Sequence, residues 1–269
     1  MIGLFLDTAT QIARHWHSDS KREKIKTELE ERNLYSSVFV KSEYKSTLLR
    51  AAIGLYNLLI RFKDLNRALR ESDDYENAEI AGIKLTPNVQ KRIQQVGHWM
   101  LEYCNYEEQK LRLEDLIEDV WEGQFHRGLN EPLIDETGCV YTEGAPEMGE
   151  SGAYNPIDVS CTIKKPAKCR IREFWDNHRI QLEVLANMNL NSIKAEPKDT
   201  DELEKVKEHA GRIINGESPH GRRCTVHLSD AIICIESTHC PEVVAVHSTN
   251  KKHFRPLGEV LGVEWEPKD

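Results

Sequence analysis

Residues 2–16, IGLFLDTATQIARHW, decide the fold class. The apolar run Ile2–Leu6 stops at Asp7, and Ile12 and Trp16 then follow at the spacing of one helix face. This pattern predicts a buried strand followed by a helix packed back on it. No basic residues precede the run, and it is far shorter than the roughly 20 apolar residues of a membrane span. We therefore expect no signal peptide and no membrane partner.

Further strands and helices alternate along the chain. The hydrophobic periodicity predicts strands at Ser37–Val40, Val243–Val246 and Val260–Trp265. It predicts a helix at Ser42–Phe62 with Ser42 as the N-cap, and one at Pro87–Leu101 with Thr86 as the N-cap. Further helices are predicted at Lys21–Arg32, Glu107–Trp121, Ile171–Met188, Asp201–Ile214 and Asp230–Glu236. Because strands that alternate with helices form parallel sheets, we expect an α/β fold.

Composition narrows the class of protein. The chain has 269 residues, 39% hydrophobic and 30% charged, which is typical of an ordinary soluble protein. Its seven cysteines, without a secretion signal, indicate reduced thiols or a metal site in a cytoplasmic protein. A net charge of -9 argues against a protein that coats nucleic acid through a basic surface. Any nucleic-acid site must be local and assisted by cations.

Polar residues stand where the predicted strands end. Asp7 ends the first strand, Glu43 lies just past the second in the first helical turn, and Asn250 follows the third; Asp230 begins the helix before that strand. The carboxyl ends of parallel strands share one edge of the sheet, where ligands bind. Hard oxygen ligands suit Mg²⁺ or Mn²⁺. Two such cations activate a water and stabilise the leaving oxygen in phosphodiester hydrolysis.

Four segments, GLFLDTATQIA, VFVKSEYKSTLLRA, LSDAIICIES and VVAVHSTNKKHFRPLGEVLGV, resemble the sequence blocks of the PIN-domain nuclease family, in the family's order. That family includes the toxin ribonucleases of bacterial toxin–antitoxin pairs. The resemblance implies a Rossmann-like parallel sheet flanked by helices and an acidic pocket that binds Mg²⁺ or Mn²⁺ and cuts single-stranded RNA. It assigns Asp7, Glu43 and Asp230 to the three acids and Asn250 to the fourth position. Where many members have Asp-Phe, this chain has His253-Phe254.

The resemblance also sets the domain boundaries that we expect. Residues 1–68 and 218–269 form a discontinuous PIN-like nuclease domain. Residues 69–217 form a mainly helical insertion with an irregular, cysteine-containing loop at about 126–168, where periodicity gives way to glycine, proline and polar residues.

Basic and hydroxyl side chains near the acids are candidate contacts to an RNA partner, single-stranded or structured: Thr8, Lys41, Lys45, Arg222, Arg223, Ser248, Thr249 and Lys251. The alternative is that the basic residues are solvated surface charges. Trp99, Trp121 and Trp175 stand at helical positions, and we expect them in the core rather than as base-stacking platforms.

The irregular loop suggests a second metal. Zn²⁺ organises loops that lack a core and takes four N or S ligands. The candidates are Cys139, Cys161 and Cys169, with His178, Cys104 or His126 as the fourth ligand. No pair has the tight zinc-knuckle spacing, so unbridged thiols are the alternative. We expect Cys104, Cys224, Cys234 and Cys240 to be small core residues.

The sequence therefore predicts a hydrolase: a metal-dependent endoribonuclease. Alternatives are a catalytically weak or inactive RNA-binding or interaction protein with this fold, or a toxin held by an inhibitor protein. A homodimer is compatible with each. Singly, Asp7 can also be a helix cap, Glu43 and Asp230 first-turn acids, and Asn250 a turn former.

Overall fold

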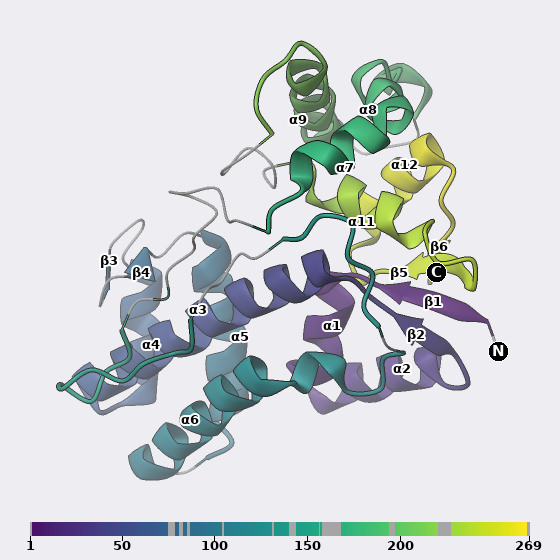
Figure 1. Ribbon diagram of the computed structural model, residues 1–269. Coiled ribbons are helices and arrows are strands. Elements are labelled where there is room, and N and C mark those ends of the chain that lie inside the picture. Colours follow the sequence, from purple (N-terminus) through teal and green to yellow (C-terminus); the bar gives the residue numbers. More distant parts are fainter. Residues whose placement is uncertain are drawn as a thin grey trace.

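The computed structural model describes residues 2–74, 79–80, 83–84, 87–103, 105–130, 132–139, 144–155, 157, 168–193, 197–219 and 227–267. They form a four-stranded parallel sheet flanked by helices (Figure 1). A separate two-stranded antiparallel ribbon is formed by β3 (Glu79–Ile80) and β4 (Ile83–Lys84). In this part of the chain, no helix combines the length and the apolar character needed to cross a membrane.

The sheet has the order β2-β1-β5-β6, and every neighbouring pair is parallel. Its strands are β1 (Gly3–Leu6), β2 (Asn33–Tyr35), β5 (Val243–His247) and β6 (Trp265–Glu266). The predicted α/β class with a parallel sheet is confirmed. The strand order reverses between β1 and β5, so the loops after these two strands diverge. Such a reversal is where open parallel sheets bind ligands.

Side chains of β1 alternate between the two faces of the sheet. Leu4 and Leu6 are fully buried and pack in one cluster with residues of α1 (Thr8–His15) and α2 (Asp19–Leu29). Phe5 belongs to the larger cluster on the other face, which includes α11 (Ser229–Ser237) and α12 (Lys251–Leu261). Figure 1 shows α1 and α2 on one side of the sheet and α11 and α12 on the other. The short apolar run is therefore covered on both faces.

The long helix α3 (Val38–Phe62) is the central helix of a group. It packs against α4 (Leu65–Asp74), α5 (Pro87–Met100) and α6 (Tyr106–Glu122). The predicted strand at Ser37–Val40 is wrong. The Ser37 hydroxyl accepts a hydrogen bond from the backbone N–H of Val40 at 3.2 Å, so Ser37 caps the helix and the following β-branched residues form its first turn.

Ser42 is therefore inside the helix rather than its cap. Its hydroxyl donates to the backbone carbonyl of Cys139 at 2.7 Å. Asn57, further along α3, exchanges two hydrogen bonds with the backbone of Tyr154, at 2.9 and 2.8 Å. The described parts of the irregular segment between η1 (Gln124–His126) and α7 (Ile171–Asn177) contain no helix or longer strand, and they are held against α3 by these contacts.

The last helices bring two further corrections. The predicted helix at Ile171–Met188 is two helices, α7 (Ile171–Asn177) and α8 (Arg179–Ala186), which break at His178; α9 (Pro197–Ile214) then packs on α8. The predicted strand at Val260–Trp265 begins too early, because α12 continues to Leu261 despite Pro256 and ends where Gly262 has a φ of 69°. Pro256 obscures the helical pattern in the sequence.

The expected helices at Lys21–Arg32, Pro87–Leu101, Glu107–Trp121, Asp201–Ile214 and Asp230–Glu236 are present with shifted ends. Thr86, the predicted cap of α5, lies outside the described residues. One hydrophobic cluster contains Phe5 and Phe254, from residues 1–68 and 218–269, together with Val120 and Leu185, from residues 69–217. The division into two domains stays a prediction, but the two parts share this cluster.

Candidate acidic site

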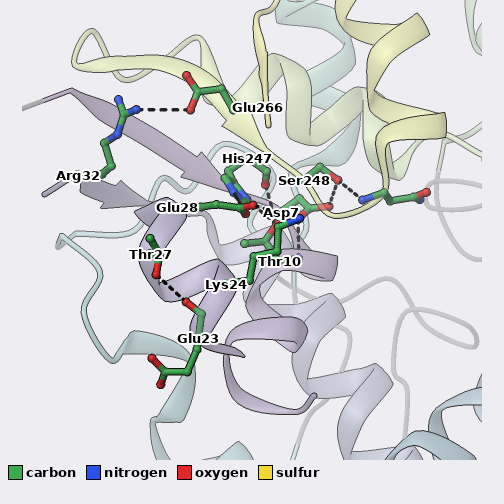
Figure 2. Close-up of polar contacts among 11 residues, drawn as sticks. Asp7, Thr10, Glu23, Lys24, Thr27, Glu28, Arg32, His247, Ser248 and Glu266 are labelled. Atoms are coloured by element: carbon green, nitrogen blue, oxygen red, sulfur yellow. Dashed lines mark hydrogen bonds and ion pairs between the residues drawn. The ribbon is translucent and has the colours of Figure 1, made fainter. Parts of the chain in front are cut away.

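Asp7 joins the loops after β1 and β5 at the point where the strand order reverses. Its Oδ1 accepts the backbone N–H of Thr10 at 2.7 Å, so Asp7 is the N-cap of α1. Its Oδ2 accepts the hydroxyl of Ser248, from the loop after β5, at 2.7 Å (Figure 2). The side chain is only 2% exposed. Capping thus accounts for one carboxyl oxygen, while the other is directed at a residue 241 positions away.

Glu43 reaches the same region from α3. It lies in the second turn of that helix, not the first, because α3 begins at Val38. Its Oε2 accepts the hydroxyl of Thr8, the residue after Asp7, at 2.7 Å. The side chain of Ser229, at the start of α11, hydrogen-bonds to it as well. Two hydroxyl donors from different elements therefore fix this carboxyl group beside α1 and α11.

Asp230 completes the group from the first turn of α11. It is half-buried, and its negative charge raises the pKa of both Asp7 and Glu43. Burial is the larger cause: it raises the pKa of Asp7 from 3.8 to about 6 and that of Glu43 from 4.5 to about 8. The structure thus brings the three predicted acids together, close enough for their charges to interact.

Burial and mutual repulsion disfavour the ionised forms of Asp7 and Glu43. Hydrogen bonds from hydroxyls lower both pKa values without restoring their usual range. Carboxylates of this kind are the ligands that Mg²⁺ and Mn²⁺ prefer, and a bound cation would relieve both the repulsion and the desolvation. The chemistry of these residues fits a hard divalent cation, but their carboxylate oxygens do not all lie within 4.8 Å of one another, so the side chains would have to move closer to share one ion.

A polar chain behind Asp7 fixes the end of α1. The Thr10 hydroxyl donates to the backbone carbonyl of His247 at 2.9 Å and lies 3.1 Å from His247 Nδ1. His247 Nε2 lies 3.2 Å from Glu28 of α2 (Figure 2). These contacts tie β5 to both helices on that face.

Among the described hydrogen bonds, Asn250 contributes to the site only through its backbone N–H. Its N–H donates to the Ser248 hydroxyl oxygen at 2.9 Å, which helps to direct that hydroxyl at Asp7. Its predicted role as a metal ligand stays a prediction. Thr249, between them, is half-buried. Thr8 uses its hydroxyl to hold Glu43 rather than presenting it to solvent.

The predicted basic contacts are only partly placed. The Lys45 ammonium lies 4.1 Å above the Trp121 ring, so this side chain packs on α6, and burial lowers its pKa to about 8. Lys41 is near enough to Lys45 to lower that pKa further. Arg222, Arg223 and the side chain of Lys251 lie outside what the structure describes.

Two residues near the acids were missed by sequence reasoning. The charge of Asp7 acts on the guanidinium of Arg92, which comes from α5 in the insertion. Glu236, about one and a half turns after Asp230 on α11, is fully buried, and burial raises its pKa to about 8, with Glu43 adding repulsion. From the sequence alone, an acid inside a helix is expected on the surface, so the pattern did not indicate that Glu236 is buried.

The expectations for cysteine and tryptophan have mixed outcomes. Cys139 and Cys234 are buried, Cys169 is half-buried, and Cys240 is half-buried rather than in the core. Cys104, Cys161 and Cys224 lie outside the described residues. Trp175 is in the core, as expected. Trp121 and Trp99 are only partly buried, and Trp99 lines a cavity.

Comparisons with protein-family models, with curated proteins and with solved structures gave no match to this chain. The resemblance to PIN-domain nucleases therefore depends on the four sequence blocks alone.

Proposed function

We propose that this protein is a metal-dependent endoribonuclease of the PIN type. The observation that carries the proposal is the meeting of Asp7, Glu43 and Asp230 from three separate elements. Two of these acids are held by hydroxyl groups, and burial and mutual repulsion raise their pKa values. Structural acids seldom gather in this way, whereas perturbed carboxyls are typical of functional sites.

Each residue has a definite task in this proposal. Asp7, Glu43 and Asp230 would hold Mg²⁺ or Mn²⁺, which when bound supplies charge stabilisation at the phosphate and acidifies a coordinated water. Ser248 and Thr8 orient the Asp7 and Glu43 oxygens through bonds of 2.7 Å each. The fixed orientation matters because a preorganised site loses little free energy to rearrangement during reaction.

Arg92 and its neighbours support a nucleic-acid substrate. Asp7 and Arg92 interact electrostatically, and Arg92 and Lys91 both act on Lys21. A cationic path of Arg92, Lys91 and Lys21 therefore leads away from the acids along α5 and the start of α2. In a chain of net charge -9, such a local path is what a phosphate backbone needs.

A cavity of about 450 Å³ lies along this path, a size within the range of small-molecule sites. Its lining includes Trp16 and Trp99, whose ring centroids are 5.3 Å apart and whose planes meet at 83°. The Trp16 indole N–H is fixed by Gln124 at 2.6 Å and Tyr44 at 3.0 Å. The two indoles already pack edge to face, so a flat base would stack on the Trp99 ring from the side of the cavity.

The proposed function is tested by incubating the purified chain with end-labelled single-stranded RNA, with Mn²⁺, with Mg²⁺ or with a chelator. We expect internal cleavage with either cation and none with the chelator, because carboxylates alone supply no charge at the phosphate. The matched DNA strand in a parallel reaction reports on the choice of sugar. Absence of cleavage under every cation, or equal cleavage with the chelator, contradicts the proposal.

Trp99→Ala is expected to weaken RNA binding by about 5- to 150-fold, since one base stacked on an aromatic ring contributes roughly 1–3 kcal/mol. The measurement is the anisotropy of a labelled single-stranded RNA in an Asp7→Asn background, where cleavage is suppressed. Trp265→Phe is the control, because Trp265 lies on β6 and not in the cavity. Equal affinities for the Trp99→Ala and control proteins would remove the base site from the proposal.

A further inference from the structure

Glu136, His178 and His239 meet although they are far from one another in sequence. Glu136 lies in the irregular loop, His178 at the break between α7 and α8, and His239 just after α11. One ligand atom from each, an imidazole nitrogen or a carboxylate oxygen, lies within 4.8 Å of the other two. This cluster joins two segments of the insertion to the C-terminal block.

The His178 ring is buried without a polar partner for one nitrogen. It is 7% exposed, and its Nε2 has no hydrogen-bond partner among the described residues. Its ring centroid lies 4.6 Å from that of Phe174 and 4.8 Å from that of His239. Buried polar atoms are nearly always satisfied, so an unsatisfied nitrogen in a His and Glu cluster points to a missing ligand.

A neutral imidazole binds metal ions through a ring nitrogen, and a carboxylate oxygen is a common companion ligand. His239 Nδ1 lies 3.2 Å from Glu136 Oε1, which places a carboxylate oxygen beside the two rings.

We propose that Glu136, His178 and His239 bind Zn²⁺. Two imidazoles and one glutamate are a ligand set that zinc uses, with a fourth position left for water. Tetrahedral zinc with bonds of ~2.0–2.2 Å separates its ligand atoms by about 3.4 Å. The three ligand atoms already lie within 4.8 Å of one another, so small side-chain rotations are enough. The exposed edge at His239 leaves that fourth position open to solvent.

This site differs from the one that the sequence suggested. Of the predicted ligands, only His178 belongs to the cluster; Cys139 and Cys169 do not, and Cys161 lies outside the described residues. The zinc would fasten the loop and α7 to the end of α11, the helix that carries Asp230. Its effect is therefore to hold the insertion in place beside the acidic site.

The test is Zn²⁺ and Co²⁺ binding by the full chain, followed by metal analysis after dialysis and by the visible spectrum of the Co²⁺ form. We expect about one equivalent of tightly held Zn²⁺ and the intense absorption bands of four-coordinate Co²⁺. His239→Gln and Glu136→Gln, at solvent-accessible positions, are each expected to lower affinity by at least about tenfold, and His178→Ala by more.

Two control variants distinguish this site from the other histidine and acid clusters of the chain. His227→Gln alters the similar pair of His209 and His227, whose rings lie 5.0 Å apart beside Glu202, and should leave Zn²⁺ binding unchanged. Asp7→Asn should also leave it unchanged, which separates this site from the acidic one.

Wild-type protein that retains under about a tenth of an equivalent of Zn²⁺ overturns the proposal, as does undiminished binding by the His239→Gln and Glu136→Gln proteins. Loss of Zn²⁺ on Cys139→Ser alone would also overturn it, because the metal would then belong to the cysteines.

Discussion

Asp7→Asn is expected to lower Mn²⁺-dependent cleavage of RNA by about 100- to 1,000-fold or more, the scale on which one preorganised electrostatic contact acts. The change removes one negative charge and keeps the shape of the side chain. The Asn side-chain oxygen can still cap α1 by accepting a hydrogen bond from the Thr10 N–H. Its amide group can donate to the Ser248 hydroxyl oxygen. The loss should therefore come from cation binding and not from unfolding.

Stability provides the second readout of the same variant. Ionised Asp7 destabilises the fold above its pKa of about 6, so its neutral replacement should leave the melting temperature unchanged or raise it in the absence of metal. Asp119→Asn is the matched control, since Asp119 pairs with Arg127 at 2.8 Å on the surface. An Asp7→Asn protein that cleaves like the Asp119→Asn protein would show that Asp7 has no catalytic task.

Metal-free protein is expected to lose stability as the pH rises from about 5 to 8. The folded-state pKa values of Asp7, about 6, and Glu43, about 8, exceed the usual values of 3.8 and 4.5. Folding therefore favours the protonated acids. Their contribution is complete below about pH 4 and is lost as the pH passes through the folded pKa values. For Asp7, the rise of the pKa from 3.8 to about 6 corresponds to about 3 kcal/mol.

Urea unfolding at pH 5.5 and pH 8, with a chelator or with Mn²⁺, measures this effect. Mn²⁺ should restore most of the lost stability at pH 8 and add little at pH 5.5, because protonated acids bind cations poorly. Glu236→Gln separates two causes: it should flatten the pH dependence, since Glu236 has a pKa of about 8, and yet keep the response to Mn²⁺. Parallel stability curves for the wild type, Glu43→Gln and Glu236→Gln would contradict the pKa assignments.

The local sequence pattern was enough to place the residues whose positions depend only on their own strand or helix. Asp7 follows an apolar run and precedes a helical pattern, so its place at the end of β1 follows from neighbouring residues alone. Asp230 and Ser248 follow in the same way from the α11 and β5 patterns. The common edge of parallel strands then brings these segments together.

The sequence could not predict contacts that depend on how distant helices pack against one another. Arg92 approaches Asp7 only because α5 packs on α3, and His239 meets His178 only because α8 lies against the C-terminal block. No spacing in the chain encodes either meeting. The wrong strand at Ser37–Val40 has a different cause: β-branched residues favour strands, but the Ser37 cap and the burial of α3 outweigh that preference.

The most direct test of the acidic site is to titrate the full chain with Mn²⁺ at pH 7.5 and to measure the free ion by electron paramagnetic resonance. We expect wild-type and His239→Gln proteins to bind Mn²⁺ with equal affinity. Asp7→Asn and Glu43→Gln should each bind at least about tenfold more weakly, because each removes one carboxylate ligand. Equal Mn²⁺ affinity in all four proteins would contradict a cation site built from Asp7, Glu43 and Asp230.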